Sequence, residues 1–242
     1  MLSLTIRKAG LLTTIQDLGR FGYGRFGVPQ AGAMDPLAFR VANRLVGNPE
    51  NTSALEMTGI GPEIVFHQET GIALAGGNLT PTLDGQVLAM WHSHLVKPDQ
   101  VLGFGARRQG ARCYLAVTGG LVVPAIMGSA ATDLDSGFGG LDGRPLRAGQ
   151  ILQIGPHTLR PLRKVRLDFL AAYSAPFEIR FVAESDGVLG DEIAALFESS
   201  RYRVSKRSDR MGYRLEGTRV PVPAAGDMIS EAIPPEIGRA HV

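Results

Sequence analysis

Several residue types that would indicate a particular class of protein are scarce in this sequence. The 242 residues include a single cysteine, which excludes an internal disulfide framework and fits a reducing compartment. No run approaches the about 18 uninterrupted apolar residues of a membrane-spanning helix. The opening stretch MLSLTIRKAGLL lacks the pattern of a signal peptide, and the net charge of +2 is too small to indicate nucleic-acid binding. We therefore expect a soluble, cytoplasmic protein whose partners include neither nucleic acid nor a membrane.

Glycine, in contrast, is abundant, with 31 of the 242 residues against a usual share of about 7%. The glycines follow no period and alternate with short apolar runs, which is typical of turns between many strands. The runs are LSLTIRK, LLTTIQ, PEIVF, GIALAG, QVLAM, HLVK, DQVLGF, RCYLAVTGG, ILQIG, VRLDFL and FEIRFV. Because these runs follow one another closely without helices between them, they favour an antiparallel barrel or sandwich over a βαβ sheet. The sequence thus predicts a mainly β fold.

Only two short helices are predicted. In PLAFRVANRLVGN, Asp35 is the N-cap, a proline occupies the first helical position and a glycine ends the helix. Leu37, Val41 and Leu45 share one face of it, with Ala38, Ala42 and Val46 beside them, and we expect this surface to be buried. The second helix is DEIAALFESS, whose first residues are acids that suit the positive end of a helix dipole.

The segment AAYSAP interrupts the series of strands and predicts a domain boundary. We expect a first domain over residues 1–172 and a smaller, partial second domain over residues 173–235. The last seven residues, EIGRAHV, match the translation of a common sequencing adapter, so residues 236–242 are predicted to be a non-native tail on a truncated chain.

The most informative stretch is the glycine-dense loop QDLGRFGYGRFGVPQAGAMD, which leads into the first helix. Glycine tolerates positive φ and lets backbone approach a ligand or another strand. GYGRFG within the loop satisfies GxGxxG, but a dinucleotide fingerprint must open directly into a helix, and here Val28 and Pro29 follow. The loop is therefore predicted to shape a pocket of another kind.

Polar residues in and after this loop are the first candidates for a site. Capping explains Asp35 by itself, and an added catalytic role is the alternative. Glu56 alternates with apolar neighbours on a predicted strand, which places it in solvent or in a polar barrel mouth. Further ligand-binding candidates are Gln16, Arg20, Gly32 and Asn43.

A second group of candidates lies further along the chain. Arg210 and Arg214 occur in SDRMGYRLEG, where arginine forks would suit carboxylates or phosphates, although a solvated basic face explains them equally well. His92 and His94 form HxH without a third ligand nearby, so we expect a surface pair and no metal site. Cys113, inside CYLAVT, is predicted to be a core residue.

Four segments together resemble a known family. GVPQAGAMDPLAFRVANRLVGN, ALEMTGIGPEIVF, AVTGG and RSDRMGYRLEG are similar in order and spacing to allophanate hydrolase subunit 2 proteins. This carboxyltransferase-type family includes the C component of bacterial 5-oxoprolinase, an enzyme assembled from components A, B and C. The resemblance extends to about Gly217 and implies cyclophilin-like β-barrels. AVTGG adds Gly119 and Gly120 to the candidate binding residues.

The resemblance also implies a function in a complex. Together with the A and B components, a C component would support the ATP-driven opening of the cyclic amide 5-oxoproline to glutamate. Arg210, Asp35 and Glu56 are then the catalytic candidates, and Arg20, Arg214 and loop N–H groups could hold phosphates or the substrate carboxylate. ATP would be bound through the complex.

Two other functions stay open at this stage. One is the carboxyltransferase half of a biotin-dependent urea or amide carboxylase. None of the four lysines lies in a Met-Lys-Met setting, so biotin would be supplied by another chain. The other is a non-catalytic regulatory module that binds a kinase-inhibitor-like partner, an interpretation that the absence of a catalytic triad supports.

Overall fold

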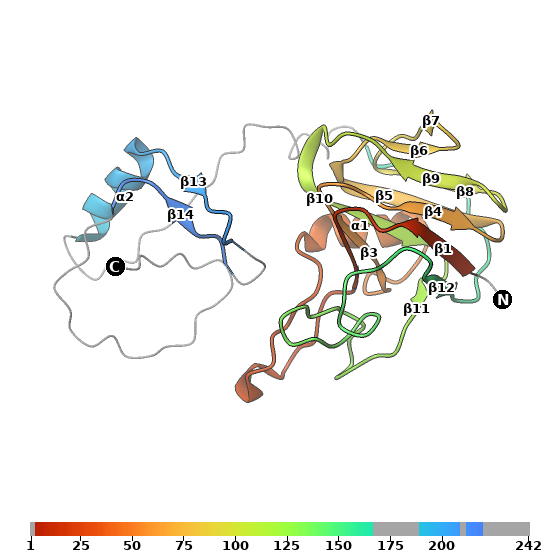
Figure 1. Cartoon of the computed structure of the whole chain (residues 1–242), viewed down its shortest axis with the longest axis horizontal. Helices are drawn as coiled ribbons and strands as arrows, with labels where there is room; N and C mark the ends of the chain where they lie inside the picture. The colour runs from red at the N-terminus through yellow and green to blue at the C-terminus, as the bar shows by residue number, and fades with distance from the viewer. Residues whose placement is uncertain (1–2, 167–188, 209–211, 220–242) are drawn as a thin grey trace. The chain divides into compact units, whose positions relative to one another are not determined.

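The computed structural model describes residues 3–166, 189–208 and 212–219. The chain divides into two compact units, Met1–Phe177 and Glu178–Val242 (Figure 1). The predicted domain boundary at residues 172–173, the tail at residues 236–242, FEIRFV and most of VRLDFL lie outside the described residues.

The first unit is built from two antiparallel sheets. A seven-stranded sheet has the order β11-β12-β1-β4-β9-β6-β7, and a five-stranded sheet has the order β2-β3-β10-β5-β8. The first sheet contains β1 (Ser3–Lys8), β4 (Glu63–Phe66), β6 (Pro81–Leu83), β7 (Gln86–Val87), β9 (Val101–Phe104), β11 (Leu121–Val122) and β12 (Ile151–Ile154). The second contains β2 (Leu12–Gln16), β3 (Ala54–Thr58), β5 (Thr70–Asn78), β8 (His92–Val96) and β10 (Gln109–Val117). The mainly β prediction is confirmed, and in the described residues the two sheets stay separate, so the barrel is not closed.

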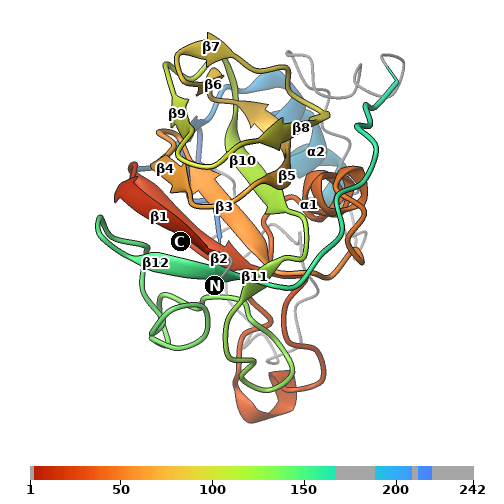
Figure 2. The same ribbon diagram turned by 90° about the vertical axis from the view of Figure 1, so that its right-hand side faces the viewer.

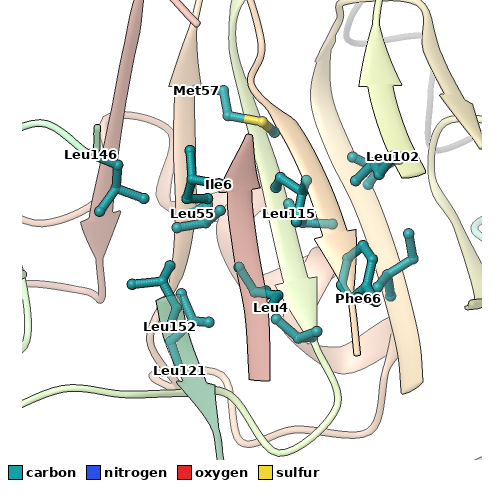
Figure 3. Packing of buried hydrophobic residues seen from close by; sticks show 14 of the residues in the cluster. Leu4, Ile6, Leu55, Met57, Phe66, Leu102, Leu115, Leu121, Leu146 and Leu152 are labelled. Carbon is teal, nitrogen blue, oxygen red and sulfur yellow. The ribbon is translucent and has the colours of Figure 1, made fainter. Parts of the chain in front are cut away.

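The main core lies between these sheets. Leu4 and Ile6 alternate with polar residues along β1 and face Leu55 and Leu115 of the other sheet (Figure 3). All four side chains are fully buried, and each such burial stabilises the fold by about 1.5–3 kcal/mol. Cys113 belongs to this core, as predicted, and burial raises the pKa of its thiol.

Helix α1 (Pro36–Leu45) covers the opposite face of the five-stranded sheet, and its predicted cap and proline are confirmed. The predicted buried face is partly wrong, because Leu37 is 49% exposed. Ala38 and Ala42 of the predicted surface are buried, as is Phe39, and an added Cβ on Gly76 of β5 would lie 3.4 Å from the Ala38 Cβ. Small residues on both surfaces let the helix approach the sheet closely, which rotates the larger Leu37 outward.

The second unit contains α2 (Leu189–Ser199), β13 (Arg203–Val204) and β14 (Leu215–Glu216). The predicted second helix is thus confirmed, and the two strands pair antiparallel. The Phe197 and Tyr202 rings lie 5.0 Å apart. Among the described residues, no helix has the length and apolar character needed to span a bilayer.

Candidate functional site

The glycine-rich loop lies beside a second loop, residues 129–143, at one end of the first unit (Figure 2). Asp17 joins the two loops. Its Oδ1 accepts hydrogen bonds from Gly19 N and Ser129 Oγ, both at 2.7 Å, and its Oδ2 accepts one from Ala130 N at 2.6 Å. Its carbonyl oxygen also accepts from Ala33 N at 2.8 Å. Asp17 was not among the site residues predicted from the sequence, although its place directly before the glycines was a usable signal.

Glycine is required where the two ends of the loop, residues 18–19 and residues 30–32, pack against each other. Gly19 has φ +96° and Gly32 has φ +90°, a region that residues with a Cβ rarely adopt. An added Cβ would lie 2.7 Å from Gln30 O at Gly19, and 2.7 Å from the Leu18 carbonyl carbon at Gly32. Gly32, a predicted binding residue, therefore allows one arm of the loop to pack on the other. A short 3₁₀ helix, η1 (Gly24–Phe26), lies within the loop.

Arg20, predicted to bind substrate or phosphate, is only 2% exposed. Its Nη2 donates to Ala131 O, and its guanidinium carbon lies 4.6 Å from the centre of the Phe138 ring. Burial lowers the pKa of Arg20, and the Asp133 and Asp17 carboxylates act in the opposite direction. The side chain therefore ties the glycine loop to the second loop.

Gln16, another predicted binding residue, is also fully buried. Its Nε2 donates to Thr14 Oγ1 at 3.0 Å and to Thr132 O at 3.2 Å. Gln16, at the end of β2, and Arg20, in the loop after β2, thus donate hydrogen bonds to the neighbouring carbonyl oxygens of residues 132 and 131.

Glu56 is 2% exposed, so of the two placements predicted for it, in solvent or in a polar barrel mouth, the first is wrong. Its Oε2 accepts hydrogen bonds from Met34 N and from the Tyr114 hydroxyl, both at 2.8 Å, and its Oε1 lies 3.7 Å from Arg112 Nε. Burial and the nearby Glu56 charge raise the pKa of Tyr114. The physical reason for the burial of Glu56 is that this face of β3 is covered by the glycine loop and α1 instead of by water.

Asp35 is adjacent to Glu56 in this network. Its Oδ1 accepts from Ala38 N at 2.9 Å as the cap of α1, and its N–H donates to the Tyr114 hydroxyl at 2.7 Å. Tyr114 therefore connects both predicted catalytic acids. Tyr114 was not among the predicted site residues, because in the sequence it has the pattern of an ordinary strand aromatic.

A second set of candidates meets near the end of α1. Asn43 is fully buried, and its Nδ2 donates to Thr52 O at 2.8 Å. Its Oδ1 accepts from Asn48 Nδ2 at 3.1 Å, and Asn48 Oδ1 accepts from Gly119 N at 2.9 Å. Asn48 was not selected from the sequence, yet it links Asn43 to Gly119.

Gly119 and Gly120 have φ +86° and +72° and form a tight turn after β10. An added Cβ on Gly119 would lie 2.4 Å from Gly155 O, and one on Gly120 would lie 2.2 Å from Thr52 Cγ2. Both positions therefore allow close packing. Gly119 also lines a cavity.

This cavity has a volume of about 390 Å³ and lies within the first unit. Three segments line it: residues 47–49 with Thr52, the pair Thr118 and Gly119, and residues from Pro156 to Arg160. It is thus separate from the network around Asp17 and Glu56, although α1 leads from one to the other.

The second unit carries the two remaining candidates. Arg210 lies outside the described residues. Arg214 is exposed, and its carbonyl oxygen accepts from Ser205 N at 2.7 Å. In the described parts of the chain, no group of three or more His, Cys, Asp or Glu side chains is arranged to hold a metal ion.

Most of the chain matches a recognised domain family. Residues 26–237 match the family model described as "Carboxyltransferase domain, subdomain A and B". The chain belongs to this carboxyltransferase family. That membership confirms the resemblance found in the sequence and agrees with the mainly β fold.

Three relatives show how far the likeness extends. The chain is 35% identical over 228 residues to the C component of 5-oxoprolinase of Haemophilus influenzae, covering 91% of this chain and 70% of that protein. It is 45% identical over 151 residues to urea amidolyase of Saccharomyces cerevisiae, covering 62% of this chain and 8% of that protein. The crystal structure of the K. lactis urea amidolyase superposes with a TM-score of 0.81 at 33% identity, over 90% of this chain and 14% of that one. The chain thus spans most of one relative and a small part of the other two.

Proposed function

We propose that this chain is the C component of a bacterial 5-oxoprolinase complex, which hydrolyses 5-oxoproline to glutamate with ATP in the cytoplasm. The observation that supports it is the likeness to the C component of 5-oxoprolinase, which covers 91% of this chain and 70% of the relative. The chain covers a far larger share of that component than of urea amidolyase, of which it covers 8%. Its partners would be a protein like the B component and a lactam hydrolase like the A component.

The chemistry explains why several components and ATP are needed. A lactam carbonyl is a poor electrophile, so water attacks it slowly. Transfer of the γ-phosphoryl group of ATP to the carbonyl oxygen, with release of ADP, makes the ring carbon electrophilic. Water then adds to that carbon, the C–N bond breaks as the nitrogen takes up a proton, and a second water releases phosphate from the resulting acyl phosphate to give glutamate. Stabilisation of the developing negative charge requires fixed donors such as N–H groups and arginines.

In this proposal the first unit supplies a preorganised framework. Asp17 and Arg20 hold two loops together from inside, and Glu56 with Tyr114 holds the start of α1. Such support from buried neighbours keeps reacting groups in one geometry. Asp35, which is half-buried at the edge of this network, and Arg210 are the groups that we propose act on substrate.

A second candidate function is the carboxyltransferase half of a urea or amide carboxylase. It is favoured by the 45% identity to yeast urea amidolyase, which exceeds the 35% identity to the 5-oxoprolinase component, although over a shorter span. Biotin would then arrive on another chain. A non-catalytic regulatory role is a third candidate, in which the chain only binds a partner like the B component.

Reconstitution tests these alternatives. The chain is combined with the A-like and B-like components of the same genome, and ADP and glutamate are measured with and without 5-oxoproline. We expect 5-oxoproline-dependent ATP hydrolysis that is lost when this chain is omitted. Turnover that needs a carboxylated biotin carrier and urea instead would support the carboxylase, and partner binding without either activity would support the regulatory role.

The same assay tests Arg210. Arg210→Ala should reduce 5-oxoproline-dependent ATP hydrolysis, whereas Arg219→Ala, an exposed arginine of the same unit, serves as the matched control. Unchanged kinetics for Arg210→Ala would remove that arginine from the site.

A further inference from the structure

The cavity at the end of α1 has features of a ligand-binding site. The names of the similar proteins assign no function to it. Its volume of about 390 Å³ is within the range of small-molecule pockets, which is about 300–1,000 Å³. Its walls come from the turn after α1, the turn after β10 and the segment after β12. Hydrogen bonds from Asn48 to Val117 O at 2.8 Å and from Gly119 N to Asn48 at 2.9 Å fix the first two walls to each other.

The charged side chains that line the cavity are all positive among the described residues. Among the described residues, no aspartate or glutamate lines the cavity, whereas Arg160 does. Arg160 makes no ion pair or hydrogen bond with the described residues, so its guanidinium donors are free for a ligand. Its aliphatic stem lies across Gly47, where an added Cβ would be 3.0 Å from Arg160 Cγ. The cavity therefore offers a cation without a competing carboxylate.

Neutral donors accompany this cation. Thr52 and Thr158 line the cavity, and their hydroxyls have no hydrogen-bond partner among the described residues. The Thr118 hydroxyl donates to Gly71 O at 3.1 Å, so it can only accept from a ligand. His157 Nδ1 donates to Gly155 O at 3.0 Å, and its Nε2 lies 3.5 Å from Thr70 Oγ1.

We propose that this cavity binds a small oxyanion, a carboxylate or a phosphate, through Arg160 and the hydroxyls of Thr52 and Thr158. The guanidinium fork matches the two oxygens of a carboxylate or of a phosphate, and hydroxyl donors complete the set. The identification of the oxyanion as the carboxylate of 5-oxoproline rests on the proposed function, whereas oxyanion binding itself does not.

Calorimetric titration of the full chain with three probes tests the proposal. L-5-oxoproline carries both a lactam and a carboxylate, 2-pyrrolidone carries the lactam alone, and inorganic phosphate supplies the other oxyanion. Each is titrated into wild type, Arg160→Gln and the matched control Arg147→Gln, an exposed arginine away from the cavity. Thermal denaturation of each variant checks that it is folded, which we expect because both positions are exposed.

We expect at least one oxyanion to bind wild type and Arg147→Gln equally, and Arg160→Gln about tenfold or more weakly, since a charge-assisted hydrogen bond is lost. Binding of 5-oxoproline without binding of 2-pyrrolidone identifies the carboxylate as the ligand group, and binding of phosphate alone identifies a phosphate site. Absence of oxyanion binding, or equal affinity in Arg160→Gln and Arg147→Gln, overturns the proposal. None of these outcomes depends on partner proteins, so failure here is distinguishable from failure of the ATP hydrolysis assay.

Discussion

Tyr114 donates its hydroxyl hydrogen to Glu56 Oε2 at 2.8 Å, and the Tyr114 hydroxyl oxygen accepts the N–H of Asp35 at 2.7 Å. One buried hydroxyl thus connects β10, β3 and the cap of α1. Because Glu56 also accepts from Met34 N, the start of the helix is held from two sides. The position of the helix after the glycine loop is therefore set by a polar contact inside the unit.

Removal of that hydroxyl should destabilise the first unit. Tyr114→Phe leaves Glu56 and the Asp35 N–H each short of one buried partner, which costs about 1–3 kcal/mol. The free energy of unfolding in urea measures the loss. Tyr23→Phe is the control, since the Tyr23 hydroxyl makes no hydrogen bond with the described residues. Equal stability of the two variants would contradict a role for the Tyr114 contact.

Asp17 should be sensitive even to an isosteric change. Asp17→Asn keeps one acceptor oxygen but turns an NH₂ group toward donors that now bind both carboxylate oxygens. We expect a loss of about 1.5–3 kcal/mol, as for hydrogen bonds to a charged group. Asp135→Asn, an exposed residue of the neighbouring loop, should change the unfolding free energy by less than about 0.5 kcal/mol. Urea unfolding of both variants would decide the point.

Gly137 and Gly139 of the second loop have nearly the same φ but differ in the room available for a Cβ atom. Gly137 has φ +70° and Gly139 has φ +75°, so alanine at either position costs about 1–2 kcal/mol for the backbone. An added Cβ at Gly137 meets nothing within 4 Å, whereas at Gly139 it would lie 2.0 Å from Ala131 O and 2.8 Å from Arg20 Nη2. Gly139→Ala should therefore cost about 1–3 kcal/mol more than Gly137→Ala. Equal melting temperatures for the two variants would contradict this, because they would show that the two loops can move apart at Gly139 without a loss of stability.

His94 should make stability depend on pH near neutrality. Burial lowers the pKa of His94; the hydrogen bond from Nε2 to Ala89 O at 2.8 Å opposes this shift, and nearby His92 adds to it. Because the folded pKa is below the unfolded value of 6.5, the unfolded state binds more protons as the pH falls below 6.5. Stability should therefore decrease from about pH 7.5 toward about pH 5.5, and His94→Gln should flatten this dependence. Parallel pH profiles for His94→Gln and wild type would contradict the effect.

Local features of the fold were predictable from the sequence. The acid, proline and glycine around α1 are a local signal, because capping involves residues only a few positions apart. Alternation in LSLTIRK likewise predicted a strand, whose buried residues include Leu4 and Ile6. The pairing order of the strands was not predictable, since β1 pairs with β4 and β12, which lie far along the chain.

The candidate residues show the same division. The sequence by itself determined which polar residues accompany the glycines, and the family to which they belong. Only the tertiary structure decided that Arg20, Gln16 and Glu56 face inward, and that Asn48 and Arg160 line a cavity. The physical reason is that the exposure of a polar side chain depends on what covers its face of the sheet. For Glu56 this cover is the loop carrying Met34, and for Arg20 it is a segment more than a hundred residues away.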